Sequence, residues 1–125
     1  MPGEMVHFDI PVDDVEKMTA FYRNVMGWTV EPYAGDFPDY WRLAPEPDKE
    51  GALEGGLGKK QMPEQGPMNY YTAEGGLEAF NQRVKDNGGM VMMEKMPVKG
   101  FGWMSVCMDP EGNAFGGWVD DPEAA

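Results

Sequence analysis

Basic residues are scarce in this sequence, and long apolar runs are absent. Only 10 lysines and arginines stand against 22 aspartates and glutamates, so the 125-residue chain carries a net charge of −12. Nucleic acids and anionic membrane surfaces are bound through basic patches, and we therefore expect neither as a partner. No apolar run approaches the length of a membrane span, and the first ten residues show no signal-peptide pattern.

Cysteine is also nearly missing. The single Cys107 excludes an internal disulfide framework, and we expect a cytoplasmic protein. No second histidine or basic neighbour is evident that would activate its thiol, so we interpret Cys107 as a small apolar residue rather than a nucleophile. Methionine, with 12 copies, is abundant. We expect most of these in the core, although methionine also lines adaptable binding surfaces.

The apolar pattern predicts the element order βαβββ twice. Alternation predicts a strand over 6–12, and an apolar stripe predicts a helix over 13–27, with Asp13 or Asp14 as N-cap and Gly27 at the end. Further strands are expected at 28–33, 39–44 and 52–58, before a solvated linker at 59–67. The second half then predicts strands at 68–73, 90–96, 101–109 and 113–120, and a helix at 75–89.

The second half also repeats the first at sparse but ordered positions. A shift of 62 positions superimposes Trp41 on Trp103, and a shift of 61 superimposes EGGL (54–57) on FGGW (115–118). We interpret this as an internal duplication. The prediction is one α+β domain over 1–125, with module 1 at about 4–60 and module 2 at about 66–120.

A glycine pair interrupts the last strand expected in each half, at Gly55–Gly56 and Gly116–Gly117. Glycine is unfavourable inside a strand because it loses backbone entropy and packs no side chain. Two interpretations are open. The missing side chains enlarge a pocket in which a ligand lies against bare backbone, or the glycines mark bulges or close contacts between the modules.

Two stretches resemble a known family. HFDIPVDDVEKMTAFYRNVMGW is similar to the opening strand and helix of the vicinal oxygen chelate superfamily, which includes glyoxalase I, bleomycin-resistance proteins and extradiol dioxygenases. GWMSVCMDPEGNAFGGW resembles its closing strands, where DPxGN turns the chain into the last one. The resemblance implies two tandem βαβββ modules whose mixed sheets curl into a cup around a ligand, and a homodimer.

Metal-dependent members of this family carry four ligands, one on the first and one on the last strand of each module. Carried over to this sequence, these positions fall on His7, Gly55, Asn69 and Gly116. Glycine has no side-chain donor and asparagine is a weak one, whereas a divalent ion needs three or four nitrogen, oxygen or sulfur donors. We therefore expect no metal and no cofactor, and a pocket lined by the glycines.

Other site candidates follow from alternation along the strands. His7, the only histidine, is expected to face the cup as a general base or hydrogen-bonding group, or else to be merely packed. Asp9 shares its face, and Asn69 and Tyr71 are expected to point inward from the second module. Trp118 is expected to form an aromatic wall.

Three further side chains have two interpretations each. Trp41 and Trp103 either line the pocket or belong to the core, the commoner place for a large aromatic residue. Arg42 either attracts an anion or forms a surface ion pair, as is usual in an acidic chain.

Three functions follow from these expectations. One is a small-molecule binding protein like the bleomycin-resistance branch, which sequesters a ligand without a metal; its acidic surface would favour a basic ligand. Another is a lyase, isomerase or dioxygenase of the same superfamily acting on a small metabolite, with or without a divalent metal and with His7 as base. The third is an interaction domain whose pocket is closed by Trp and Met side chains.

Overall fold

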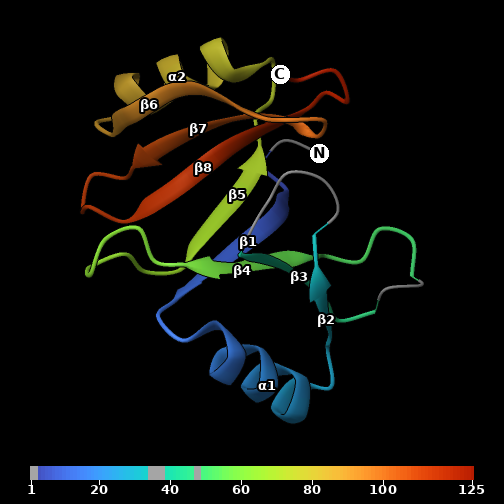
Figure 1. Ribbon diagram of the computed structural model, residues 1–125. Coiled ribbons are helices and arrows are strands. Elements are labelled where there is room, and N and C mark those ends of the chain that lie inside the picture. Colours follow the sequence, from blue (N-terminus) through green and yellow to red (C-terminus); the bar gives the residue numbers. More distant parts are fainter. Residues whose placement is uncertain (1–2, 34–38, 47–48) are drawn as a thin grey trace. The chain divides into compact units, whose positions relative to one another are not determined.

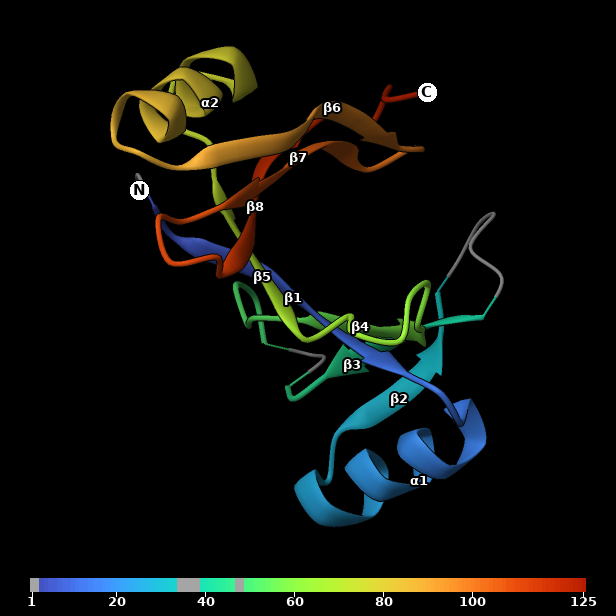
Figure 2. The same ribbon diagram turned by 90° about the vertical axis from the view of Figure 1, so that its left-hand side faces the viewer.

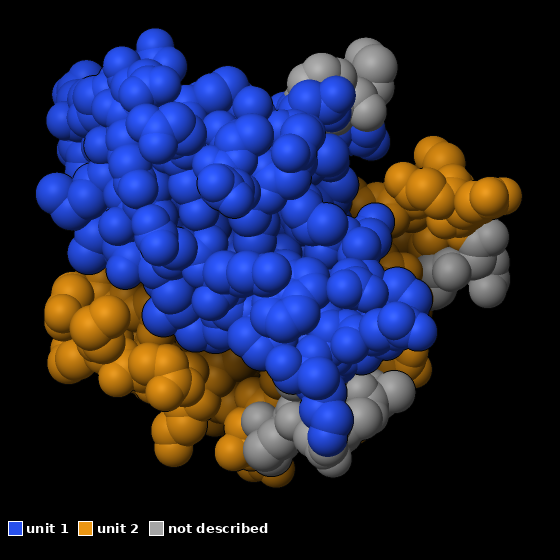
Figure 3. Space-filling model, turned by 90° about the horizontal axis from the view of Figure 1, so that it is seen from above, with its two compact units in different colours: residues 1–6, 68–125 blue, residues 7–67 orange. Residues whose placement is uncertain are grey.

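The computed structural model describes residues 3–33, 39–46 and 49–125 (Figure 1). The chain divides into two compact units, coloured separately in Figure 3: residues 1–6 and 68–125 form unit 1, and residues 7–67 form unit 2. Within the described residues, no helix is long and apolar enough to cross a membrane.

Unit 2 has four strands in the order β2-β3-β4-β1, with α1 on one face (Figure 1). β1 pairs with β4 in parallel, and the other neighbours are antiparallel. The elements are β1 (Met5–Val12), α1 (Val15–Met26), β2 (Thr29–Pro32), β3 (Tyr40–Ala44) and β4 (Gly55–Lys59).

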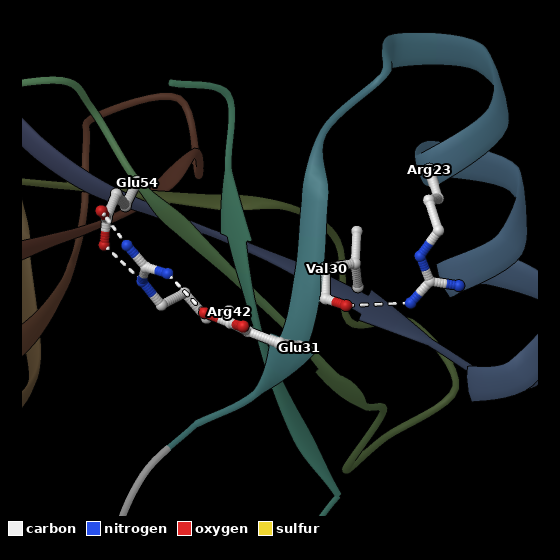
Figure 4. A network of polar contacts seen from close by, with 5 residues as sticks. All are labelled: Arg23, Val30, Glu31, Arg42 and Glu54. Carbon is white, nitrogen blue, oxygen red and sulfur yellow. Dashed lines mark hydrogen bonds and ion pairs between the residues drawn. The ribbon is translucent and has the colours of Figure 1, made fainter. Parts of the chain in front are cut away.

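The ends of α1 follow from its sequence. The Asp14 carboxylate accepts a hydrogen bond from the Lys17 N–H at 3.0 Å, so Asp14 rather than Asp13 is the N-cap. Gly27 adopts the left-handed conformation with φ 71°, and its N–H bonds to the Arg23 carbonyl. The Arg23 side chain in turn donates to the Val30 carbonyl at 2.9 Å and ties α1 to β2 (Figure 4).

The core of unit 2 is apolar. Leu43 and Leu57 are fully buried, and Phe8 of β1 packs against them together with Trp41 of β3. The alternation predicted for β1 is therefore confirmed, and Trp41 belongs to the core. His7 and Asp9 consequently point to the opposite face of the sheet, called here the open face of unit 2.

Unit 1 repeats this topology with the strand order β5-β8-β7-β6 and α2 packed over β6, β7 and β8 (Figure 2). β5 and β8 are parallel, and the other neighbours are antiparallel. The elements are β5 (Met68–Thr72), α2 (Leu77–Asp86), β6 (Met90–Val98), β7 (Gly102–Met108) and β8 (Ala114–Asp120). The predicted α+β class with two βαβββ modules is confirmed.

The core under α2 is more polar than the core under α1. Ser105 and Cys107 are fully buried on β7, and Asn81 of α2 is 6% exposed. The Asn81 amide donates to the Glu94 carbonyl at 2.9 Å, which satisfies its buried donor. Cys107 is thus a small core residue, as predicted, and burial raises the pKa of its thiol.

Candidate functional site

The strand glycines of unit 2 are covered by aromatic rings. A Cβ at Gly55 would collide with the ring of Phe8, which lies across β4 on the α1 face. A Cβ at Gly56 would collide with the hydroxyl end of Tyr40, which lies across β4 on the open face. Each glycine therefore lets a ring from a neighbouring strand rest on the backbone.

The strand glycines of unit 1 are also covered by aromatic rings. A Cβ at Gly116 would collide with the ring of Tyr70, and one at Gly117 with the ring of Phe80 from α2. The expectation that these glycines enlarge a pocket is wrong, because rings already fill the space. The other interpretation, that the glycines allow a close contact, is correct. The contact, however, is between an aromatic ring and the strand backbone within one unit, and not between the modules.

The register of the repeat differs by one residue from the sequence alignment. Phe8 pairs with Gly55 on the α1 face, and Tyr71 pairs with Gly117 on the α2 face, where Gly117 meets Phe80. Because side chains alternate along a strand, a slip of one residue reverses every expected face.

This register corrects three expected placements. Gly55 lies on the α1 face, and its neighbour Gly56 lies on the open face. Tyr71 lies on the α2 face, where its ring packs against Phe115 with 6.4 Å between centroids, and Asn69 shares that face by alternation. The expectation that Gly55, Asn69 and Tyr71 face away from the helices is therefore wrong.

The expected faces of Gly116 and Trp118 agree with the structure. Both lie on the side of β8 away from α2, because Val106 and Met104 of β7 are their partners and Phe115 and Gly117 point the other way. The Trp118 indole N–H donates to Asp120 at 2.7 Å.

A hydrogen-bonded cluster occupies the open face of unit 2. The His7 Nε2 lies 3.0 Å from the Asp9 Oδ1 and 2.8 Å from the Tyr40 hydroxyl, and that hydroxyl also donates to Asp9. The His7 and Asp9 side chains are 24% and 27% exposed, so the cluster is partly desolvated yet open to solvent. His7 and Asp9, both predicted from sequence, are thus brought together.

The Tyr40 hydroxyl is the donor to Asp9, so the Asp9 carboxyl group is an acceptor in this cluster. The His7 Nε2 lies within hydrogen-bond distance of both other members. The cluster therefore places a carboxyl group, an imidazole and a phenol side by side.

Flanking residues support this cluster. The Tyr33 ring stacks on Tyr40, with 5.0 Å between centroids and 19° between planes. Burial raises the pKa of the Tyr33 phenol, and the charges of Glu54 and Asp9 raise it further. Tyr33 therefore stays protonated and serves as a neutral platform for the Tyr40 ring.

Arg42 lies on the same face as an ion-pair partner. Its guanidinium contacts Glu54 through Nε at 2.9 Å and also through a terminal nitrogen, and it contacts Glu31 at 2.7 Å (Figure 4). The bonds to Glu54 raise the pKa of Arg42, whose charge is thereby matched within the protein. Of the two interpretations of Arg42, the ion pair is confirmed.

A pocket of about 440 Å³ opens beside the cluster. Part of the segment expected to be a solvated linker forms its wall, and carboxylate, phenol, amide and ammonium groups all reach it. Its lining includes Asp9, Asp39, Tyr40, Lys59, Lys60 and Gln65. Lys60 also pairs with Asp13 at 3.5 Å, and the Gln65 side chain accepts from the Gln61 N–H at 2.7 Å, so the wall is held by its own contacts.

Sequence reasoning missed Tyr40 in this site. The signal was present, because Tyr40 and Arg42 alternate with Trp41 and Leu43, which are core residues. A tyrosine on the open face next to a strand glycine can lay its ring across the neighbouring strand. The strand glycine that Tyr40 covers is not adjacent to it in sequence, so the alternation within the strand alone does not predict the contact.

Comparisons with known proteins agree with the fold. A family model described as bleomycin resistance protein-like N-terminal matches residues 4–40. Among solved structures, a glyoxalase/bleomycin resistance protein/dioxygenase superfamily member from Vibrio splendidus 12B01 has a TM-score of 0.65 at 18% identity, covering 94% of this chain and 99% of its own. The family-model match and the shared fold support the vicinal oxygen chelate superfamily for this chain.

Three further similar proteins widen the comparison. A hypothetical protein from Bacillus halodurans C-125 has a TM-score of 0.69 at 15% identity, covering 98% of both chains. The anthracycline biosynthesis proteins DauV of Streptomyces sp. (strain C5) and DnrV of Streptomyces peucetius are each 30% identical over 94% of this chain and 47% of their own length. The chain thus spans about half the length of these curated relatives.

The metal positions of the vicinal oxygen chelate superfamily do not suit an ion here. On the open face of unit 2, Gly56 offers no side-chain donor, Glu54 is held by Arg42, and His7 already bonds two neighbours. In the part of the chain that the structure describes, no group of three His, Cys, Asp or Glu side chains is placed to hold a metal. This donor set does not match a catalytic divalent ion.

Proposed function

We propose that this protein binds a small organic molecule on the open face of unit 2, beside the His7–Asp9–Tyr40 cluster and without a metal ion. The observation that supports this most directly is the pocket, because Asp9 and Tyr40 belong both to the cluster and to its lining. Its volume of about 440 Å³ falls within the range of small-molecule sites, about 300–1,000 Å³. A carboxylate and a phenol held by neighbours can orient a ligand without first becoming ordered.

The lining favours a ligand that carries a basic group on an aromatic or apolar body. Asp9 and Asp39 reach the pocket, and the net charge of −12 attracts cations at long range. The Tyr40 ring offers an aromatic surface, and Lys59 offers a donor to a ligand oxygen. The curated relatives are named for anthracycline biosynthesis, and an anthracycline joins a fused aromatic body to an amino sugar.

The test is an NMR titration of the full chain with doxorubicin, followed by a panel of aromatic amines. We expect saturable shifts of the backbone amides of Asp9, Tyr40 and residues 58–61. Asp9→Asn and Tyr40→Phe should each weaken binding at least fivefold, whereas Glu111→Gln, an exposed change in unit 1, should not. Added salt should lower the affinity. Shifts confined to other residues, or no shift at these amides with the whole panel at millimolar concentration, would contradict the proposal.

A second candidate function is proton transfer on the bound molecule, as in a lyase or isomerase of the superfamily. The supporting observation is that the Tyr40 hydroxyl proton, the Asp9 carboxylate and the His7 Nε2 lie within one hydrogen-bonded cluster. Deuterium incorporation from D₂O into a bound carbonyl compound, abolished by Asp9→Asn, would support it. Binding without deuterium incorporation would contradict proton transfer and would favour a protein that only sequesters its ligand.

We also propose a cytoplasmic homodimer. The resemblance to the superfamily supports the dimer, and the single buried cysteine supports a reducing compartment. Sedimentation of the purified protein tests the first point, and fractionation of the native host tests the second.

A further inference from the structure

A second pocket opens beside α2 in unit 1. Its volume of about 430 Å³ falls within the range of small-molecule sites, about 300–1,000 Å³. Its lining includes Thr72, Glu74, Phe80, Arg83, Val84 and Phe115. Every lining residue belongs to unit 1, and none of them lines the pocket described in unit 2. The pocket beside α2 is therefore a separate candidate site.

The apolar part of this pocket is aromatic and held in place. Phe80 of α2 and Phe115 of β8 meet edge to face, with 6.2 Å between ring centroids and 74° between planes. The Phe80 ring rests on the backbone of Gly117, and the Tyr71 ring packs against Phe115. Because these contacts fix the rings, a ligand can pack against them at little cost in side-chain entropy.

The Arg83 guanidinium is held at this pocket by neutral groups. Its Nη2 donates to the Glu74 main-chain carbonyl at 2.8 Å, and its Cζ lies 6.0 Å from the centre of the Phe80 ring. In the part of the chain that the structure describes, no carboxylate forms an ion pair with Arg83, whereas Arg42 has two such partners. A guanidinium has five N–H donors, so the charge and most of the donors of Arg83 are available to an anionic group.

Glu74 adds the opposite charge to the same lining. It is exposed, and the hydrogen bond from Arg83 goes to its carbonyl rather than to its carboxylate. A simple anion would be attracted by Arg83 but repelled by Glu74 and by the net charge of −12. A molecule that carries both an ammonium and a carboxylate can pair with both side chains and has no net charge to be repelled.

We infer that the pocket beside α2 binds a small zwitterion with an aromatic body, which is the chemistry of an aromatic amino acid. The ligand ring packs against Phe80 and Phe115, its carboxylate pairs with Arg83, and its ammonium pairs with Glu74. The inference concerns unit 1 alone and does not depend on the function proposed for unit 2. Both charged side chains are exposed, and water weakens their pull on a ligand, so we expect a dissociation constant of about 1 mM.

The test is an NMR titration of the full chain with L-phenylalanine and with two molecules that each lack one of its charges. These are 3-phenylpropionate, which lacks the ammonium, and 2-phenylethylamine, which lacks the carboxylate. With L-phenylalanine we expect saturable shifts of the backbone amides of Thr72, Glu74 and Arg83. At these amides the other two molecules should each bind at least threefold more weakly.

Two pairs of variants test the two charges, and circular dichroism confirms that each variant is folded. Arg83→Gln should weaken the binding of L-phenylalanine at least fivefold. Its control is Arg23→Gln, which removes the same charge from an exposed arginine of unit 2 that also donates to a main-chain carbonyl, and which should leave binding within twofold. Glu74→Gln should weaken binding at least threefold, whereas Glu78→Gln, an exposed change in the first turn of α2, should leave it within twofold.

Several results would overturn the inference. No shift at these amides with 20 mM L-phenylalanine would mean that the pocket does not bind this class of molecule. Equal binding of all three molecules would mean that the two charges take no part, and tighter binding of either singly charged molecule would assign the pocket to an ion of that sign. Shifts confined to Asp9, Tyr40 and residues 58–61 would place the molecule in unit 2, which would support the function proposed there and contradict only the present inference.

Discussion

The substitution Gly56→Ala tests the central feature of the site. The new methyl group would stand where the hydroxyl end of Tyr40 now lies, so the ring must move off β4. Tyr40 would then lose its hydrogen bonds to Asp9 and His7, each worth about 1 kcal/mol. Overpacking in a well-filled region costs about 1–3 kcal/mol, but a half-buried ring can swing partly into solvent. We therefore expect a loss of about 2 kcal/mol in the free energy of unfolding.

The assay is urea denaturation at 25 °C and pH 7, read by circular dichroism. Gly66→Ala is the matched control, because nothing lies within 4 Å of a Cβ at that position and its effect should stay within about 0.5 kcal/mol. Tyr40→Ala supplies the second arm of a double-mutant cycle. In that background the collision is relieved, and Gly56→Ala should cost less by at least about 1 kcal/mol.

Two results would refute this reasoning. An unfolding free energy of Gly56→Ala within about 0.5 kcal/mol of wild type would mean that the Tyr40 ring does not rest on this backbone. An equal cost of Gly56→Ala with tyrosine and with alanine at position 40 would mean that the substitution acts on the strand itself and not through the Tyr40 ring.

Three further predictions concern the cores and the turn before β8. Leu43→Ala, at a fully buried position, should lower the free energy of unfolding by about 3 kcal/mol with an unchanged urea m-value; a cost below about 1 kcal/mol would contradict the core described for unit 2. Hydrogen bonds from Asn113 lower the pKa of Asp109 below its usual value of about 3.9, so its contribution to stability is complete above about pH 4 and is lost as the pH falls through the folded-state pKa. The urea midpoint of Asp109→Asn should therefore fall less between pH 7 and pH 2 than that of wild type, and parallel curves would count against the turn. Cys107 should resist a thiol reagent at pH 8 in the native protein and react promptly in urea, because it is fully buried and burial raises the pKa of its thiol; prompt native labelling would show an open core in unit 1.

Much of the fold could be predicted from the sequence because it depends on residues that are close together in the chain. The alternation of β1 depends on residues two apart, and the ends of α1 depend on Asp14 and Gly27, which act through their own neighbours. The polar DPEGN turn before β8 is likewise local, since Asp109 bonds the backbone N–H groups of Glu111 and Asn113. These local patterns predict the structure without knowledge of which residues lie on the neighbouring strands.

The register of the repeat was not readable in the same way. Sparse identities align Gly55 with Gly116, whereas the contacts of Phe8 and Phe80 align Gly55 with Gly117. The difference of one residue is small in an alignment but reverses a strand face, and for this reason Tyr71 was expected on the wrong side. Only the rings that cover the glycines distinguish the two registers.

The glycines and their rings also constrain how this protein can change over time. A carboxylate at position 56 or 116 would meet Tyr40 or Tyr70, so an acidic ligand gained at either position displaces a ring and costs the contacts that the ring makes now. A lineage with this arrangement therefore loses stability on the way to metal coordination, even though a single nucleotide change converts a glycine codon into one for aspartate or glutamate.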